Sequence, residues 1–127
     1  MTLNEEQRQN QRLSETSGRP SLKFCALAYE AQDSTQATPI ILIVLEDANG
    51  SLRFLVDPDW RAVVRVQDVE YIESLLSDFP ERAKEQPANL FKQLSSLEVG
   101  PLVTRETGER ISDHPPLAEL CSRFVQL

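Results

Sequence analysis

The residues of this chain that are best suited to chemistry begin with the acids and the asparagine of VLEDANGSLRFLVDPDW, residues 44–60. Such oxygen ligands suggest a calcium loop, which needs a side-chain oxygen at its first position and a bidentate glutamate at its twelfth. Aligning the loop on Asn49 and Gly50 places Leu45 first and Val56 last, and neither side chain can bind calcium. Asn-Gly between two apolar runs instead predicts a tight β-hairpin, because both residues tolerate positive φ.

A second set of residues could take part in catalysis. Asp57 and Asp59 could act as general acid and general base if their surroundings differed enough to give them different pKa values. A nucleophilic cysteine needs a base beside it, and the chain offers Cys25, Cys121 and one histidine, His114. The favoured interpretation assigns no catalytic residue. We keep as an alternative a small enzyme that uses some of these side chains, namely Asp57, Asp59, His114 or Cys25.

The sequence predicts no cofactor and no metal. Its four glycines do not form the phosphate-binding patterns G-x-x-x-x-G-K-[ST] or G-x-G-x-x-G. A zinc site needs about four ligands, which one histidine and two distant cysteines do not supply. A sensor domain with a small-molecule pocket between sheet and helices is a further alternative.

The charge of the chain limits its partners. Its 20 acids against 13 bases give a net charge of -7, whereas nucleic acids and anionic membranes attract basic surfaces. We therefore expect neither partner and predict binding to another protein, with a basic partner and self-association both left open. The candidate partner-binding residues are the single tryptophan and a strip of acids, namely Trp60, Glu70, Glu73, Asp78 and Glu81.

The first half of the chain predicts strands. Residues 21–30 and 39–46 are apolar enough to be covered on both faces. Residues 52–56 complete the hairpin, and Asp57-Pro58-Asp59 is expected to turn the chain into another short strand over 60–66.

The second half predicts three helices. Residues 68–79 place Val69, Tyr71, Ile72 and other apolar residues on one side, and Pro80 is expected to end this helix. Pro87 and Pro115-Pro116 are expected to open two more, of which the first ends at Gly100-Pro101. Residues 102–105 and 109–111 form a candidate strand pair. The expected fold is α+β, a mostly antiparallel sheet of about four to five strands with about three helices on one face.

The first twenty residues differ from the rest. Beyond Met1, their only large apolar residues are Leu3 and Leu13, which predicts a flexible polar tail over 1–20 and a single domain over 21–127. The tail lacks the apolar core of a secretory signal. Cys25 and Cys121 are expected to be buried thiols in a reducing compartment, the cytoplasm, with a disulfide between them as the alternative.

These observations predict a non-catalytic protein-interaction module of the cytoplasm. It would act as an adaptor, a partner-specific chaperone or an inhibitor of the immunity or antitoxin type.

Overall fold

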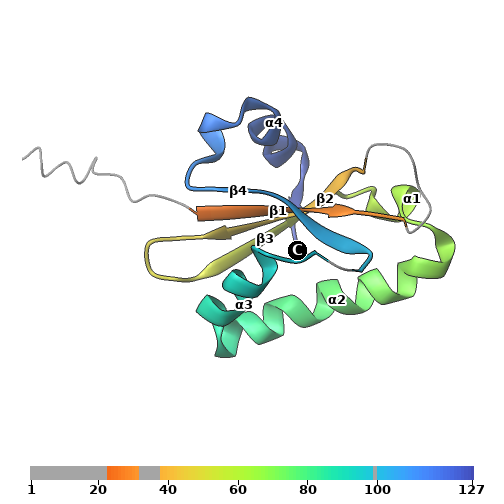
Figure 1. The fold of residues 1–127 in the computed structure, drawn as a ribbon, viewed down its shortest axis with the longest axis horizontal. Coiled ribbons are helices and arrows are strands. Elements are labelled where there is room, and N and C mark those ends of the chain that lie inside the picture. The colour runs from red at the N-terminus through yellow and green to blue at the C-terminus, as the bar shows by residue number, and fades with distance from the viewer. Residues whose placement is uncertain (1–22, 32–37, 99) are drawn as a thin grey trace, which may run out of the picture.

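The computed structural model describes residues 23–31, 38–98 and 100–127. The predicted tail, residues 1–20, lies outside this part of the chain. Within it, five strands form one antiparallel sheet, and four α-helices accompany them (Figure 1). The strands are β1 (Lys23–Tyr29), β2 (Ile40–Glu46), β3 (Leu52–Val56), β4 (Leu102–Gly108) and β5 (Val125–Gln126), in the sheet order β4-β1-β2-β3-β5.

The predicted hairpin is confirmed. β2 and β3 pair in antiparallel register from Leu42 with Val56 to Glu46 with Leu52. Gly50 in the turn has a φ of 84°, which favours glycine. The Asp47 carboxylate accepts hydrogen bonds from the backbone N–H groups of Asn49 and Ser51, at 2.8 and 3.0 Å. The acid that resembled a calcium ligand therefore closes the turn.

The sheet is covered on both faces, because alternate residues of its central strands are buried on opposite sides. Cys25, Leu27 and Tyr29 of β1 belong to one cluster of buried residues, which we call the helix-side core. Phe24 and Ala26 belong to a second cluster, the α4-side core. β1 and β2 are thus interior strands, as their continuous apolar sequences predict.

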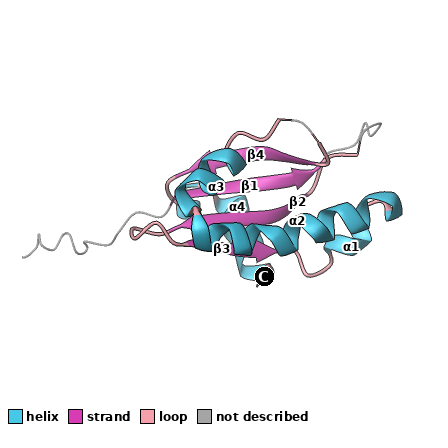
Figure 2. Cartoon of the chain, turned by 90° about the horizontal axis from the view of Figure 1, so that it is seen from below, coloured by secondary structure: helices cyan, strands magenta, loops and turns pink. Residues whose placement is uncertain are grey.

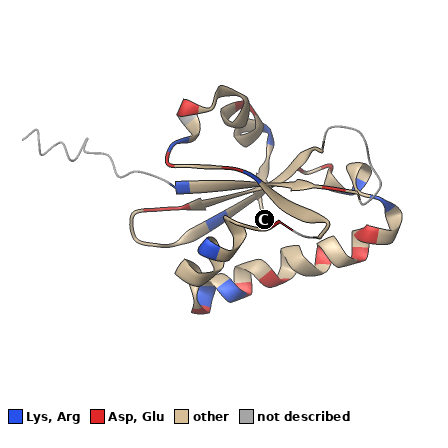
Figure 3. Cartoon of the chain, viewed as in Figure 1, with Lys and Arg blue, Asp and Glu red and all other residues tan. Residues whose placement is uncertain are grey.

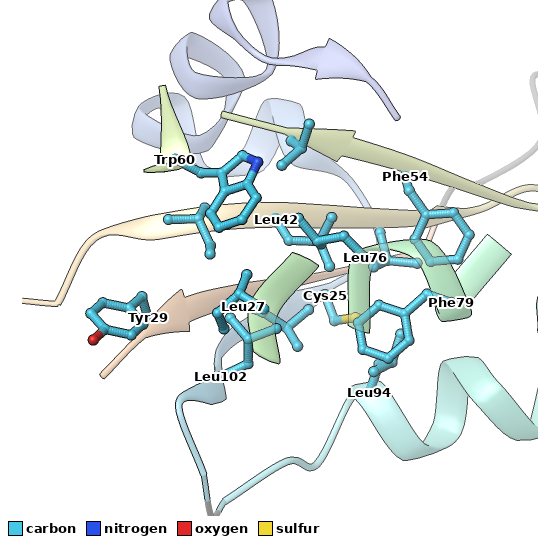
Figure 4. Packing of buried hydrophobic residues seen from close by; sticks show 14 of the residues in the cluster. Cys25, Leu27, Tyr29, Leu42, Phe54, Trp60, Leu76, Phe79, Leu94 and Leu102 are labelled. Atoms are coloured by element: carbon cyan, nitrogen blue, oxygen red, sulfur yellow. The ribbon is translucent and has the colours of Figure 1, made fainter. Parts of the chain in front are cut away.

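Three helices contribute to the helix-side core, and the fourth lies on the opposite face of the sheet (Figures 1 and 2). The helices are α1 (Trp60–Val63), α2 (Val66–Glu85), α3 (Pro87–Leu94) and α4 (Pro115–Arg123). Phe54 of β3 and Phe79 of α2 stack with ring centroids 6.3 Å apart, on the right in Figure 4. The predicted α+β class is confirmed, and α4 adds a third layer.

The strand predicted over residues 60–66 is wrong, because the segment begins with the short helix α1. The turn before it determines this outcome. The Asp57 carboxylate accepts the Asp59 N–H at 2.9 Å, and the Asp57 carbonyl accepts the Trp60 N–H at 3.0 Å. These bonds start a helical turn that directs Trp60 into the helix-side core, although tryptophan and valine favour strands.

The prediction that Pro80 ends its helix is also wrong, because α2 continues through Pro80 to Glu85. Proline has no N–H for the carbonyl of Leu76, four residues earlier, so the helix loses one hydrogen bond there. Phe79 is buried and Ala83 packs against the same core. Apolar contacts on both sides of the proline therefore outweigh the missing bond.

The segment after α3 differs from the prediction in two ways. α3 ends at Leu94, earlier than Gly100, because the Thr104 hydroxyl donates to the Leu94 carbonyl at 2.6 Å and accepts the Leu97 N–H at 2.8 Å. The strand pair predicted across 107–108 is wrong: β4 runs through Gly108 and pairs with β1, while residues 111–113 form a 3-10 helix.

The last residues form a strand that the sequence did not predict. The helix that Pro115-Pro116 opens, α4, ends at Arg123. β5 follows and pairs with β3, Val125 opposite Val56 and Gln126 opposite Leu55. A two-residue strand is too short to show a period of its own.

Candidate functional site

The longest helix presents a row of carboxylates to solvent. α2 buries Ile72, Leu76 and Phe79, so residues on its opposite side face away from the core. All four acids that the sequence nominated for partner binding are exposed on this helix. We call them the acidic face: Glu70, Glu73, Asp78 and Glu81.

The charge of α2 changes sign along its length. From Val66 to Glu81 the helix carries the acidic face and Asp68, and no lysine or arginine. Its two bases, Arg82 and Lys84, come in the last turn. Figure 3 shows this change along the helix from red to blue. Acids near the N-terminus and bases near the C-terminus interact favourably with the helix dipole. This order of charges therefore also stabilises the helix.

Three members of the acidic face have cationic neighbours. Arg61 donates to Glu73 at 2.5 Å, Arg82 lies 3.6 Å from Asp78, and Lys84 lies 3.3 Å from Glu81. These side chains are about half exposed or more, and ion pairs of this kind contribute little to stability. Glu70 has no ion-pair partner among the residues that the structure describes. A cationic ligand would therefore displace only weak contacts.

Trp60, the remaining nominated residue, lies beneath this surface and not on it. Its side chain is 5% exposed and packs in the helix-side core (Figure 4). The guanidinium of Arg61 lies 4.5 Å from the centroid of the indole ring, a favourable cation–π distance. Since Arg61 also holds Glu73, Trp60 positions one edge of the acidic face without being available for direct contact.

Two exposed apolar residues accompany the acidic face, and sequence reasoning missed both. Val66 is 89% exposed and Tyr71 is 51% exposed. The sequence placed Val66 in a strand and Tyr71 in the buried stripe. Tyr71 lies at the margin of that stripe, where a helical wheel alone does not separate buried from exposed positions. It lines a groove of about 130 Å³ between α2 and the start of β4, with Leu75, Leu97 and Pro101.

The residues of the alternative enzyme site are not brought together. Cys25 is buried in the helix-side core, where burial raises the pKa of its thiol to about 12 against a smaller opposing effect of the Ser95 side chain. His114 lies on the other face of the sheet, its ring 5.3 Å from that of Phe24 and its Nδ1 3.5 Å from the Glu106 carboxylate. The sheet therefore separates the thiol from the imidazole.

Asp57 and Asp59 serve the turn before α1. In the described part of the chain, no hydrogen bond or ion pair joins either carboxylate to His114. Their visible role is the one described for the turn, in which the Asp57 side chain accepts the Asp59 N–H. Turn formation accounts for the Asp57 carboxylate.

The two cysteines are free thiols, and a disulfide between them is wrong. Cys121 packs against the α4-side core, across the sheet from Cys25. It is only partly buried, so the expectation of two buried thiols is confirmed for Cys25 alone. Burial raises the pKa of Cys121, and the nearby charge of Arg53 lowers it by less.

Among residues 23–31, 38–98 and 100–127, no three or more His, Cys, Asp and Glu side chains gather as a metal site would require. No helix in this part is both long and apolar enough to cross a membrane. Comparison of the chain with protein-family models, with curated proteins and with solved structures gives no match.

Proposed function

We propose that this protein is a non-catalytic interaction module that binds a basic segment of another protein on the acidic face of α2. It would act as an adaptor, a partner-specific chaperone or an inhibitor of the immunity or antitoxin type. The observation that carries the proposal is the run from Val66 to Glu81, which holds five exposed or half-exposed acids and no lysine or arginine of its own.

The electrostatics of this face support a cationic partner. A cluster of one sign of charge raises the rate of encounter with an oppositely charged ligand and rejects ligands of like charge. The overall charge of -7 adds to the same field. It argues against nucleic acid and against anionic membranes as partners.

The apolar residues beside the acids favour direct contact with the partner, in addition to electrostatic attraction. Tyrosine is enriched at protein interfaces because it offers apolar area together with a polar tip. Tyr71 and Val66 lie on the same helix as the acidic face and are exposed. A basic ligand with an apolar side chain could bury both while its cations meet the carboxylates. The free thiols support a reducing compartment, and we place the protein in the cytoplasm.

The test neutralises the acidic face without changing its shape. The triple variant Glu70→Gln, Asp78→Asn, Glu81→Gln is compared with the wild type by affinity purification from extract of its own cells, followed by titration with the purified partner. We expect one basic protein to bind the wild type, with an affinity that falls as salt rises and falls about tenfold or more in the variant.

A matched control removes three exposed carboxylates elsewhere, at Glu109, Asp113 and Glu119. The control changes the net charge equally, and we expect it to bind almost as the wild type does. Equal loss of binding in both variants would show that only net charge matters. Full binding by the α2 variant would show that the partner uses another surface.

A further inference from the structure

A small groove lies next to the acidic face, between α2, the segment that joins α3 to β4, and the start of β4. We call it the anchor groove. Its apolar lining includes Tyr71 and Leu75 of α2, Leu97 and Pro101 of the joining segment, and Leu102 of β4. Its volume is about 130 Å³, whereas pockets that hold small molecules measure about 300–1,000 Å³. The size of the anchor groove therefore suits one side chain of a ligand and excludes a whole metabolite.

The walls of the anchor groove have apolar surface that a ligand can bury. Tyr71 is 51% exposed, and Leu75 and Leu97 are half-buried. Leu94 and Leu102 also line the groove, but each is 2% exposed and belongs to the helix-side core. The core thus holds the floor of the groove in place. A ligand side chain that entered the groove would remove the walls from water, which is the favourable change in hydrophobic binding.

Arg82 is the only charged side chain that lines the anchor groove among the described residues. Its guanidinium donates to the side-chain oxygen of Gln93 at 2.5 Å and lies 3.6 Å from the Asp78 carboxylate. Arg82 therefore links α2 to α3, and Asp78 balances its charge. The contacts that remain for a ligand inside the groove are apolar, so the side chain that fits there is uncharged.

Carboxylates without ion-pair partners lie on both sides of the anchor groove. On the α2 side, Glu70 directly precedes Tyr71 and is exposed. On the opposite side, Glu98 directly follows Leu97, is exposed, and lines a neighbouring depression together with it. Neither acid makes an ion pair within the described part of the chain. A side chain in the groove therefore has negative charge on two sides, which complements cations on both sides of it.

We propose that the anchor groove binds one aliphatic or aromatic side chain of the basic ligand, and that this residue stands between two lysine or arginine residues of the ligand. The inference rests on the proposed function, because it names the part of the basic segment that determines selectivity. The acidic face attracts any cationic segment, whereas the groove favours those that carry an apolar residue among their cations. An apolar side chain in a fitted pocket is a common source of binding energy at interfaces.

The experiment titrates the isotope-labelled full chain with two blocked peptides of equal charge, Gly-Lys-Leu-Lys-Gly and Gly-Lys-Ser-Lys-Gly, and follows the amide resonances by NMR. We expect the leucine peptide to shift the resonances of Tyr71, Leu75 and Leu97. It should bind at least about fivefold more tightly than the serine peptide, because only leucine brings apolar surface into the groove. The serine peptide should shift mainly the resonances of the acidic face.

A first pair of variants tests the apolar wall. Tyr71→Ala removes one wall of the groove, and we expect the ratio of the two affinities to fall to about twofold or less. Val66→Ala is the matched control, because Val66 is an exposed apolar residue of α2 outside the groove lining, and it should keep the wild-type ratio. Each ratio is measured within one variant, and the NMR spectrum shows that the variant is folded.

A second pair of variants tests the flanking charges. Glu70→Gln with Glu98→Gln should weaken both peptides by a similar factor and keep their ratio, because the two peptides carry the same cations. Glu109→Gln with Glu119→Gln removes the same number of exposed carboxylates elsewhere and should leave both affinities nearly unchanged.

Equal affinity of the wild type for the two peptides would overturn the proposal without affecting that for the acidic face, because charge alone would then explain binding. Leucine-dependent shifts confined to another surface would also overturn it. A dilution series of the free chain completes the test. If the Tyr71 and Leu97 resonances shift with protein concentration, a second copy fills the groove and the proposal is wrong. The acidic face fails separately, if the basic partner binds its triple variant as tightly as the wild type.

Discussion

Tyr29 illustrates how a single buried polar group can anchor a helix to the sheet. Its side chain is buried in the helix-side core at the end of β1. The hydroxyl donates to the Asp68 carboxylate in the first turn of α2 at 2.6 Å and accepts the Arg65 N–H at 3.3 Å. Burial raises the pKa of Tyr29, and the hydrogen bond to Asp68 raises it further. The hydroxyl thus stays neutral and holds the start of α2.

Replacing Tyr29 by phenylalanine should therefore destabilise the protein. The variant leaves the Asp68 carboxylate and the Arg65 N–H without their shared partner, and we expect the free energy of unfolding to fall by about 1–2 kcal/mol. Tyr71→Phe is the matched control, because that ring is half exposed, and it should change stability by less than about 0.5 kcal/mol. Urea denaturation measures both. Equal stability of the two variants would contradict the role given to Tyr29.

Cys25 makes the stability of the fold depend on pH in the alkaline range. Its thiol has a pKa raised from 9.0 to about 12 by burial in the folded state. Above about pH 9 the unfolded chain loses this proton while the folded chain keeps it, so the free energy of unfolding falls as pH rises towards 12. Below pH 9 both states hold the proton, and the thiol adds no pH dependence.

Cys25→Ala should flatten this dependence, even though its stability at neutral pH is lower. Urea midpoints at several pH values between 8 and 10.5 measure the slope, a range of about two and a half units around the ordinary thiol value. Cys121→Ala is the control and should keep most of the wild-type slope, since Cys121 is only partly buried. A wild type and a Cys25→Ala variant with the same slope would contradict this account.

At the scale of elements, α2 is central, because it contributes to the helix-side core and carries the acidic face. Its weakest point as a helix is Pro80, which lies inside it. Pro80→Ala restores an N–H for the Leu76 carbonyl and removes the ring that crowds it. We expect the free energy of unfolding to rise, by up to about 3 kcal/mol. Thermal and urea denaturation test this, with Ser77→Ala as a nearly neutral control. A less stable Pro80→Ala variant would show that the proline ring contributes more by packing than the helix loses.

Elements with strong local signals were predictable, and those determined by neighbours were not. Asn49-Gly50 predicts its own turn. The spacing of apolar residues predicts α2, and the prolines at their first turns predict α3 and α4. α1 depends on the hydrogen bonds of Asp57, which override the strand preference of its residues. β5 depends on β3 as a template. The apolar residues of β1 and β2 indicate that both faces of the sheet are covered. They do not indicate which helix covers each face, so the position of α4 could not be predicted.

The candidate surfaces also differ in how far the sequence predicts them. The acidic face could be predicted, since carboxylates opposite an apolar stripe are expected to meet solvent. The burial of Trp60 and the exposure of Val66 could not, because both depend on where the preceding turn directs the chain. The groove of about 470 Å³ between α2 and the sheet edge of β3 and β5 could not be predicted either. It joins Leu52 and Phe54 to Pro80 and Ala83, and it includes a strand that only the folded sheet defines.

For the whole molecule, the proposed function describes an acidic adaptor that would bind its partner on one helix. The acidic face of α2 and the net charge of -7 would attract the same basic ligand.

The binding role of α2 is tested most directly by site-specific photo-crosslinking in the cells from which the protein comes. A photoreactive phenylalanine analogue is placed at Ser74, an exposed position between Glu70 and Asp78, and in a second strain at Ala118, an exposed position on α4. We expect irradiation to join the Ser74 variant to one basic protein and to leave the Ala118 variant without that adduct. The account is contradicted if Ser74 yields no adduct, or if both positions yield the same proteins.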